Sequence, residues 1–162
     1  MSLSPLRRRH AALLGVLALL GGTMALLSEH FLSAANLLGM TRHLAEVGIV
    51  ACGMTLIIMT GGIDLSVGSV IALTGVVCAL GLREGWPPLL PVLVAVGTGA
   101  LVGLVNALAI TRLRVVPFIA TLGMLGIARG AAKWLADQST VDSPTSWVNE
   151  LAVTFPPADW ML

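Results

Sequence analysis

The sequence predicts an all-α integral membrane protein, a polytopic helical bundle with about five transmembrane helices. Of its 162 residues, 57% are hydrophobic and only 10% are charged, and the mean hydropathy is +0.96. Soluble domains carry about 25% charged residues, so this deficit favours a membrane. The apolar residues also fall in long runs, which are typical of helices that are apolar all round. The net charge of +1 and the absence of a basic stripe argue against a nucleic-acid partner.

The first span is expected at residues 11–28, after a cytoplasmic N-terminus at residues 1–10. This uncharged run is longer than the apolar core of a signal peptide, about 7–15 residues, so a retained helix is favoured. The mixed segment from Glu29 to His43 is expected to be interfacial or a loop. His43 and Glu46 would share a helical face, as a polar pair at the membrane boundary.

The stretch from Val47 to Leu82 contains a single charge, Asp64, and its 36 residues are too many for one span. The sequence predicts two short arms, 47–60 and 67–82, joined by a chain reversal. Glycines tolerate positive φ, so Gly61 and Gly62 suit the reversal. Asp64 or Ser66 can cap the following helix. An Asp inside an apolar run is also a candidate functional group.

Two further spans are expected at residues 89–110 and 115–135, followed by a periplasmic polar tail at residues 136–162. Pro117 predicts a helix start or a kink, and the Thr121 hydroxyl can satisfy a backbone group that the proline frees. Arg129 and Lys133 lie four residues apart and are expected to snorkel to the outer interface.

The positive-inside rule supports the two-arm interpretation. With the N-terminal arginines in the cytoplasm, a reversal at Asp64 brings Arg112 and Arg114 to the cytoplasmic side as well. A single span over 47–82 would place this second basic turn outside. The predicted topology therefore has five spans, with the N-terminus inside and the C-terminus outside.

Small residues spaced one helical turn apart indicate close helix packing in lipid. The candidates for helix packing are Gly99, Gly103, Gly126 and Gly130. Cys52 and Cys78 lie within apolar runs and are expected to pack as small hydrophobic residues. The sequence has no phosphate-binding glycine loop, zinc-type His pair or nucleophile with a base, so neither an enzyme, a metal site nor a cofactor is expected.

Two motifs carry a resemblance to a known family. The first is Gly53-Met54-Thr55-Leu56 leading into Thr60-Gly61-Gly62-Ile63-Asp64-Leu65-Ser66-Val67-Gly68-Ser69. The second is Asn106 followed by Val116-Pro117-Phe118-Ile119-Ala120-Thr121-Leu122-Gly123-Met124 and Arg129-Gly130. In order and spacing they resemble the ribose/xylose/galactose-type permeases of ABC importers, over roughly residues 31–141.

The resemblance implies a multi-pass subunit of the bacterial plasma (inner) membrane that forms part of a sugar pathway. Its implied partners are a second permease subunit (homo- or heterodimer), a cytoplasmic ATP-binding subunit that hydrolyses ATP, and a periplasmic sugar-binding protein. Polar residues in the apolar background are the candidates for pathway or gating positions: Gly61, Gly62, Asp64, Ser66, Asn106 and Thr121.

Other interpretations stay open at this point. Members of the family are expected to be about twice as long, with a coupling loop for the ATPase in their later half. The chain is therefore also interpreted as a permease fragment or half-permease, or as a non-transporting structural or regulatory subunit. A small ion or proton carrier that uses Asp64 is a further alternative, and Asp64 can act as a gate or only as a cap.

Overall fold

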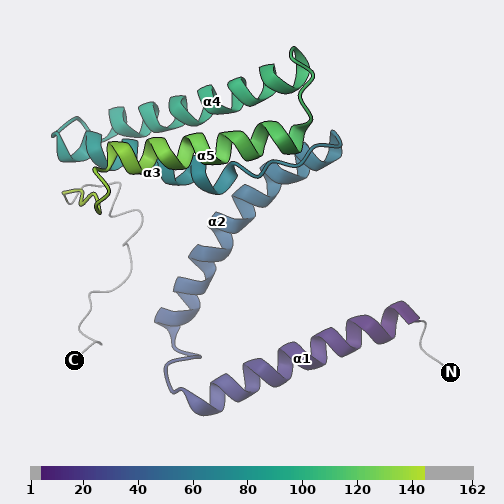
Figure 1. The fold of residues 1–162 in the computed structure, drawn as a ribbon. Coiled ribbons are helices and arrows are strands. Elements are labelled where there is room, and N and C mark those ends of the chain that lie inside the picture. The colour runs from purple at the N-terminus through teal and green to yellow at the C-terminus, as the bar shows by residue number, and fades with distance from the viewer. Residues whose placement is uncertain (1–4, 145–162) are drawn as a thin grey trace. The chain divides into compact units, whose positions relative to one another are not determined.

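The computed structural model describes residues 5–144, which form five α-helices and no strand (Figure 1). The helices are α1 (Pro5–Leu27), α2 (Ala34–Met59), α3 (Val67–Arg83), α4 (Leu89–Thr111) and α5 (Pro117–Leu135). The predicted all-α class is thereby confirmed. Trp147, Glu150 and most of the predicted polar tail lie outside the described residues.

The chain divides into two compact units, residues 1–47 and 48–162. In the first unit, Ser33 caps α2, because its Oγ accepts a hydrogen bond from the Asn36 N–H at 3.2 Å. The Asn36 Nδ2 donates back to the Phe31 carbonyl at 2.7 Å. These two bonds fix the turn between α1 and α2.

The helical start of α2 corrects one expectation. The mixed segment that ends at His43 is helical from Ala34 onward, so the loop alternative is wrong, and its interfacial position stays a prediction. A 26-residue helix reaches about 39 Å at 1.5 Å per residue, which exceeds the roughly 30 Å of hydrocarbon. We expect its polar first turns to extend into the headgroup region. His43 Nδ1 lies 3.7 Å from Glu46 Oε2, and both side chains are exposed, as expected of a boundary pair of little energetic weight.

Three stretches of the described chain are long and apolar enough to cross a membrane by length and composition: His10–Leu27, Ala34–Met59 and Leu89–Thr111. α3 is apolar but short, at 17 residues. α5 carries Arg129 and Lys133 in its second half, which lowers its mean hydropathy. The division of the chain into five crossings stays a prediction.

In the second unit, α3 packs against both α4 and α5 (Figure 1). α3 and α5 are parallel, since Thr121 lies near Ile63 at one end and Ala128 lies near Leu73 further along. α4 is antiparallel to both: Asn106 bonds Ser66, whereas Gly81, near the opposite end of α3, lies near Pro91. Small residues on α5 line the contact with α3, and the central cluster contains Leu73, Ala128 and Ala132.

Among the glycines of the described helices, Gly81 has the tightest surroundings, and it was not one of the predicted packing glycines. A Cβ added to Gly81 would lie 2.9 Å from Pro91 Cγ, and Pro91 is itself fully buried. Of the predicted packing glycines, only Gly99 has a neighbour, the Thr74 methyl group at 3.5 Å from an added Cβ. Added Cβ atoms at Gly103, Gly126 and Gly130 would meet nothing within 4 Å. Packing by these three against another chain stays a prediction.

Candidate functional site between α2 and α3

The helical backbone breaks between Met59 and Val67, where the sequence predicted a reversal. Thr60 and Gly61 turn the chain, and Gly61 has a φ of 79°. The Gly62 N–H donates to the Ile57 carbonyl at 3.2 Å, which closes the end of α2. The break is confirmed, while the direction in which each arm crosses the membrane stays a prediction.

The two adjacent glycines have different backbone requirements, and substitution by alanine distinguishes them. We expect Gly61→Ala to lower the free energy of unfolding by about 1–3 kcal/mol, because an L-residue at positive φ is strained. Gly62→Ala is the matched control, since its new Cβ would make ordinary contacts of 3.5–3.7 Å. Thermal unfolding in detergent micelles checks both variants. Equal stability of the two would show that positive φ does not set the turn.

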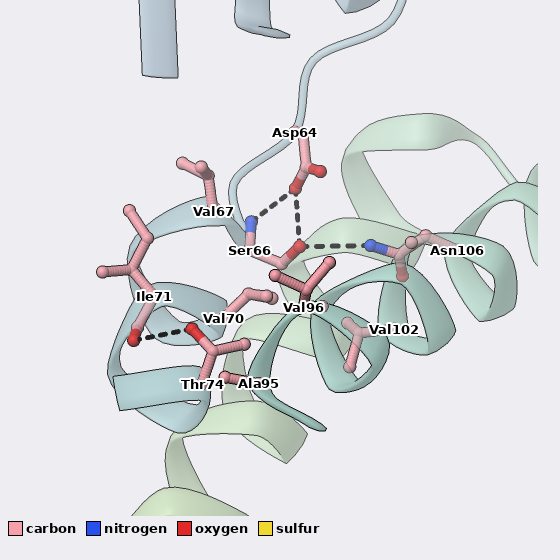
Figure 2. A pocket seen from close by; sticks show the side chains of 12 residues that line it. Asp64, Ser66, Val67, Val70, Ile71, Thr74, Ala95, Val96, Val102 and Asn106 are labelled. Atoms are coloured by element: carbon pink, nitrogen blue, oxygen red, sulfur yellow. Dashed lines mark hydrogen bonds between the residues drawn. The ribbon is translucent and has the colours of Figure 1, made fainter. Parts of the chain in front are cut away.

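Asp64, Ser66 and Asn106 form one hydrogen-bonded network (Figure 2). Asp64 Oδ1 accepts from the Ser66 N–H at 2.7 Å and from the Ser66 Oγ–H at 2.6 Å. Asn106 Nδ2 donates to Ser66 Oγ at 3.1 Å. Since the Ser66 hydroxyl proton is already given to the carboxylate, Asn106 must present its NH₂ group to that oxygen. The Ser66 hydroxyl thus bridges the carboxylate of Asp64 and the side-chain amide of Asn106 on α4.

The geometry revises the capping interpretation. Ser66 is the N-cap residue of α3, but its side chain makes no capping hydrogen bond. Its hydroxyl is committed to Asp64 and Asn106, so capping by the Ser66 side chain is wrong. Asp64 instead bonds the backbone N–H two residues on, as in an Asx turn, and so orders the entry into α3.

Thr121 ties α5 to the same segment. Its hydroxyl lies 2.9 Å from the Pro117 carbonyl and 3.2 Å from the Ile63 carbonyl, so one proton serves either acceptor. Pro117 occupies the first turn of α5, and Val116 before it has the extended ψ of 130° expected ahead of a proline. Thr121 is 2% exposed. The helix start predicted at Pro117 is confirmed. Thr121 does bond backbone carbonyls, but these belong to Pro117 and Ile63 and not to the residue 113 carbonyl that a proline at position 117 frees.

Two cavities border the network, with volumes of about 340 Å³ and about 480 Å³. Asp64, Gly103 and Asn106 line both, so these three residues lie where the two hollows meet. Ser66 and Thr74 belong to the smaller cavity, which Figure 2 shows. The larger cavity adds Gly62, Pro117 and Thr121. Gly61 lines neither of these two cavities.

Two acceptor oxygens of the network remain available to a ligand. The hydrogen bonds of Asp64 all involve Oδ1, and those of Asn106 involve Nδ2, within residues 5–144. In that same region no buried side-chain N or O atom lacks a partner, so Asp64 Oδ2 and Asn106 Oδ1 are accessible rather than sealed. Each is an acceptor for a hydroxyl group.

The network is recessed within the bundle. Asn106 lies five residues before Thr111, the last residue of α4, which corresponds to about 7–8 Å along the helix axis. Arg112 and Arg114 follow directly in the turn at this end. Asp64 and the basic turn thus share one end of the three-helix bundle, as the topology prediction requires, and the acid lies deeper.

Neither a metal centre nor a thiol pair accompanies this site. In the part of the chain that the structure describes, no group of three or more His, Cys, Asp or Glu side chains is close enough to hold a metal ion. Cys52 is exposed and Cys78 is half-buried, and both are free thiols. The site consists of hydrogen-bonding oxygens and one amide in apolar walls.

Comparison with known proteins identifies the family. Residues 36–159 match the family model described as branched-chain amino acid transport system / permease component. The chain belongs to this permease family. Its predicted resemblance to sugar-type permeases is confirmed by the curated relatives, and no solved structure gives a significant match.

The relatives of this permease chain are named as sugar import permeases. The fructose import permease protein FrcC of Rhizobium meliloti is 42% identical over 100 residues, which are 61% of this chain and 28% of that protein. The ribose import permease protein RbsC of Bacillus subtilis is 40% identical over 107 residues, 66% of this chain and 33% of that protein. The galactofuranose transporter permease protein YtfT of Escherichia coli is 40% identical over 116 residues, which are 70% of this chain and 34% of that protein. The match thus spans about a third of each relative.

The family and the apolar helices place the permease chain in the bacterial inner membrane as a multi-pass protein. The family is one of transport permeases rather than of enzymes.

Proposed function

We propose that this chain is a membrane-spanning subunit of an ABC-type sugar importer and forms part of its translocation pathway, with ATP hydrolysed by a separate subunit. The observation that carries the proposal is the Asp64–Ser66–Asn106 network, which borders two cavities at their meeting point. A carboxylate in an apolar bundle costs several kcal/mol unless it is compensated, so its retention there favours a functional role.

The chemistry of the site suits a sugar. Sugar hydroxyls donate hydrogen bonds, and Asp64 Oδ2 and Asn106 Oδ1 are two accessible acceptors on facing elements. The apolar walls, with Val67, Val70 and Ile71 among them, suit the C–H faces of a sugar ring. The three named relatives carry fructose, ribose and galactofuranose in their names, which supports the same substrate class here.

In this proposal the residues at the break act as pathway or gating positions. Side-chain hydrogen bonds among Asp64, Ser66 and Asn106 hold the start of α3 against α4. A conformational change can exchange these bonds for hydrogen bonds to a sugar. Gly61 and Gly62 give the segment the backbone freedom to move, and Thr121 holds it against α5.

The proposed partners are a second permease subunit, a cytoplasmic ATP-binding subunit, a periplasmic sugar-binding protein and membrane lipid. Much of the apolar surface of the described helices is unpaired within the chain; for example, Leu26 is 90% exposed and Ile49 is 76% exposed. Gly126 and Gly130 offer α5 a smooth surface for a second helix. The alternative class, a non-transporting structural or regulatory subunit or a permease fragment, uses the same surfaces without a pathway.

Substitution of Asp64 tests the proposal. We expect Asp64→Asn to lower sugar uptake at least about tenfold, because a hydrogen bond to a charged group is worth about 1.5–3 kcal/mol. An Asn side chain keeps one acceptor oxygen, so both bonds from Ser66 can persist and the fold is retained. The measurement is uptake of labelled ribose, fructose and galactose by cells that express the chain with its ABC partners, with and without the ATPase.

The control is Asp142→Asn, an exposed acid outside both cavities. Uptake that persists without the ATPase and disappears in Asp64→Asn would instead identify an ion-coupled carrier. A change in abundance or assembly, with no ATPase-dependent uptake by the unmodified chain, would identify a structural subunit.

A further inference from the structure

A third cavity lies at the C-terminal end of α5, away from the candidate pathway, with a volume of about 420 Å³. Two cations four residues apart, Arg129 and Lys133, line it from one face of α5. Two polar residues after the helix, Gln138 and Ser139, line it as well. The remaining lining residues are apolar: Ala72, Val76, Ala132 and Ala136.

The residues after α5 are held in place by the way the helix ends. The Gln138 N–H donates to the Lys133 carbonyl at 2.9 Å, and the Ser139 N–H donates to the Ala136 carbonyl at 3.0 Å. Asp137 and Gln138 both take positive φ, 50° and 56°. This tight ending keeps Gln138 and Ser139 at the cavity wall, where the Gln138 amide is a donor for an anion.

The two cations have no acidic partner in the described part of the chain. Neither cation takes part in the His43–Glu46 or the Arg83–Glu84 ion pair, and no acidic side chain lines the cavity. Like charges at i and i+4 repel each other on a helix, so the pair favours an anion between them. Lys133 also interacts with the C-terminal end of the helix dipole, an effect that does not require a cavity.

We propose that this cavity binds the phosphodiester headgroup of an anionic membrane phospholipid. A free phosphate would satisfy the cations but not the apolar part of the lining, Ala72, Val76, Ala132 and Ala136. Trp134 directly follows Lys133 and is 78% exposed, so it lies at the same level along the helix axis but roughly 100° around it, outside the cavity. Tryptophan is enriched at the headgroup level of both membrane interfaces, and phosphate oxygens accept charge-assisted hydrogen bonds from Arg and Lys side chains. The lipid then anchors the end of α5 to α3 through Ala72 and Val76.

Lipid retention by the full 162-residue chain tests the proposal, measured by native mass spectrometry from detergent micelles. We expect phosphatidylglycerol to be retained over phosphatidylcholine. Arg129→Gln or Lys133→Gln should weaken retention about fivefold each, and the double variant about 25-fold, from the attraction of a basic residue to an anionic lipid surface. Millimolar inorganic phosphate should not displace the lipid.

The matched control is the double variant Arg112→Gln/Arg114→Gln, which removes the same charge at the opposite end of the bundle, outside the cavity. It should weaken retention of phosphatidylglycerol much less than the Arg129/Lys133 double variant does. The charge-conserving pair Arg129→Lys/Lys133→Arg should keep the preference for phosphatidylglycerol. Equal retention of both lipids by the unmodified chain would overturn the proposal without any substitution, and would leave an acidic protein partner as the anion. Full displacement by inorganic phosphate, or retention by the Arg129/Lys133 double variant, would overturn it too.

Discussion

Ser66→Ala is expected to lower the free energy of unfolding by about 1–3 kcal/mol, the cost of leaving a buried polar group without its partner. Ser66 is 1% exposed, and its hydroxyl both donates to Asp64 and accepts from Asn106. Removing that oxygen leaves the Asn106 amide, on a residue that is 6% exposed, without its acceptor. Asp64 then keeps only the hydrogen bond from the backbone N–H of residue 66.

A double-mutant cycle between Ser66→Ala and Asn106→Ala measures the bond directly, by thermal unfolding in detergent micelles. The coupling free energy is expected to be about 0.6 kcal/mol, the average for side-chain hydrogen bonds between membrane helices, and at most about 1.7 kcal/mol. Thr23→Ala is the control, because that exposed hydroxyl bonds only the Leu19 carbonyl of its own helix. Strict additivity of the two substitutions would show that Ser66 and Asn106 do not interact.

Ala128→Leu is expected to destabilise the bundle by about 1–3 kcal/mol or more, because extra methylene groups in a packed contact force backbone shifts. Ala128 is 1% exposed between α5 and α3, in the cluster with Leu73 and Ala132. A leucine there pushes α5 away from α3. The same displacement strains the hydrogen bond from Thr121 to the Ile63 carbonyl, so sugar uptake should fall as well.

The matched control is Ala100→Leu on α4, an exposed position that lines neither pathway cavity. Its melting temperature should stay within the range of ordinary surface substitutions. Combining Ala128→Leu with Leu73→Ala conserves volume approximately and should recover part of the lost stability. If the Ala128→Leu variant has the same melting temperature as the unmodified chain, the contact between α3 and α5 is not tightly packed.

Several features followed from the sequence because they rest on local properties. Low charge and long apolar runs predicted the all-α membrane class, and the family motifs predicted the permease family. Gly61 marked a turn because glycine adopts positive φ readily, and Pro117 marked a helix start because it lacks an N–H. Each of these follows from one residue type or from a count along the chain.

The beginning of α2 shows where such counting fails. Arg42, His43 and Glu46 interrupt the apolar run, so a span was expected only from residue 47, yet the helix begins at Ala34. Helix formation requires only backbone hydrogen bonds and a cap, which Ser33 supplies. Charged side chains mark the depth at which a helix leaves hydrocarbon rather than the residue at which it ends.

The sequence by itself determined which residues are polar in an apolar background, and hence that Asp64, Ser66, Asn106 and Thr121 required an explanation. Only the tertiary structure decided how they are satisfied. Ser66 and Asn106 are 40 residues apart in the sequence, and their contact depends on the antiparallel register of α3 and α4. The close contact between Gly81 and Pro91 helps to set that register. The cavity beside Arg129 and Lys133 likewise depends on α3 and α5 lying parallel. Helix register is set by side-chain packing over the whole contact, so no local pattern encodes it.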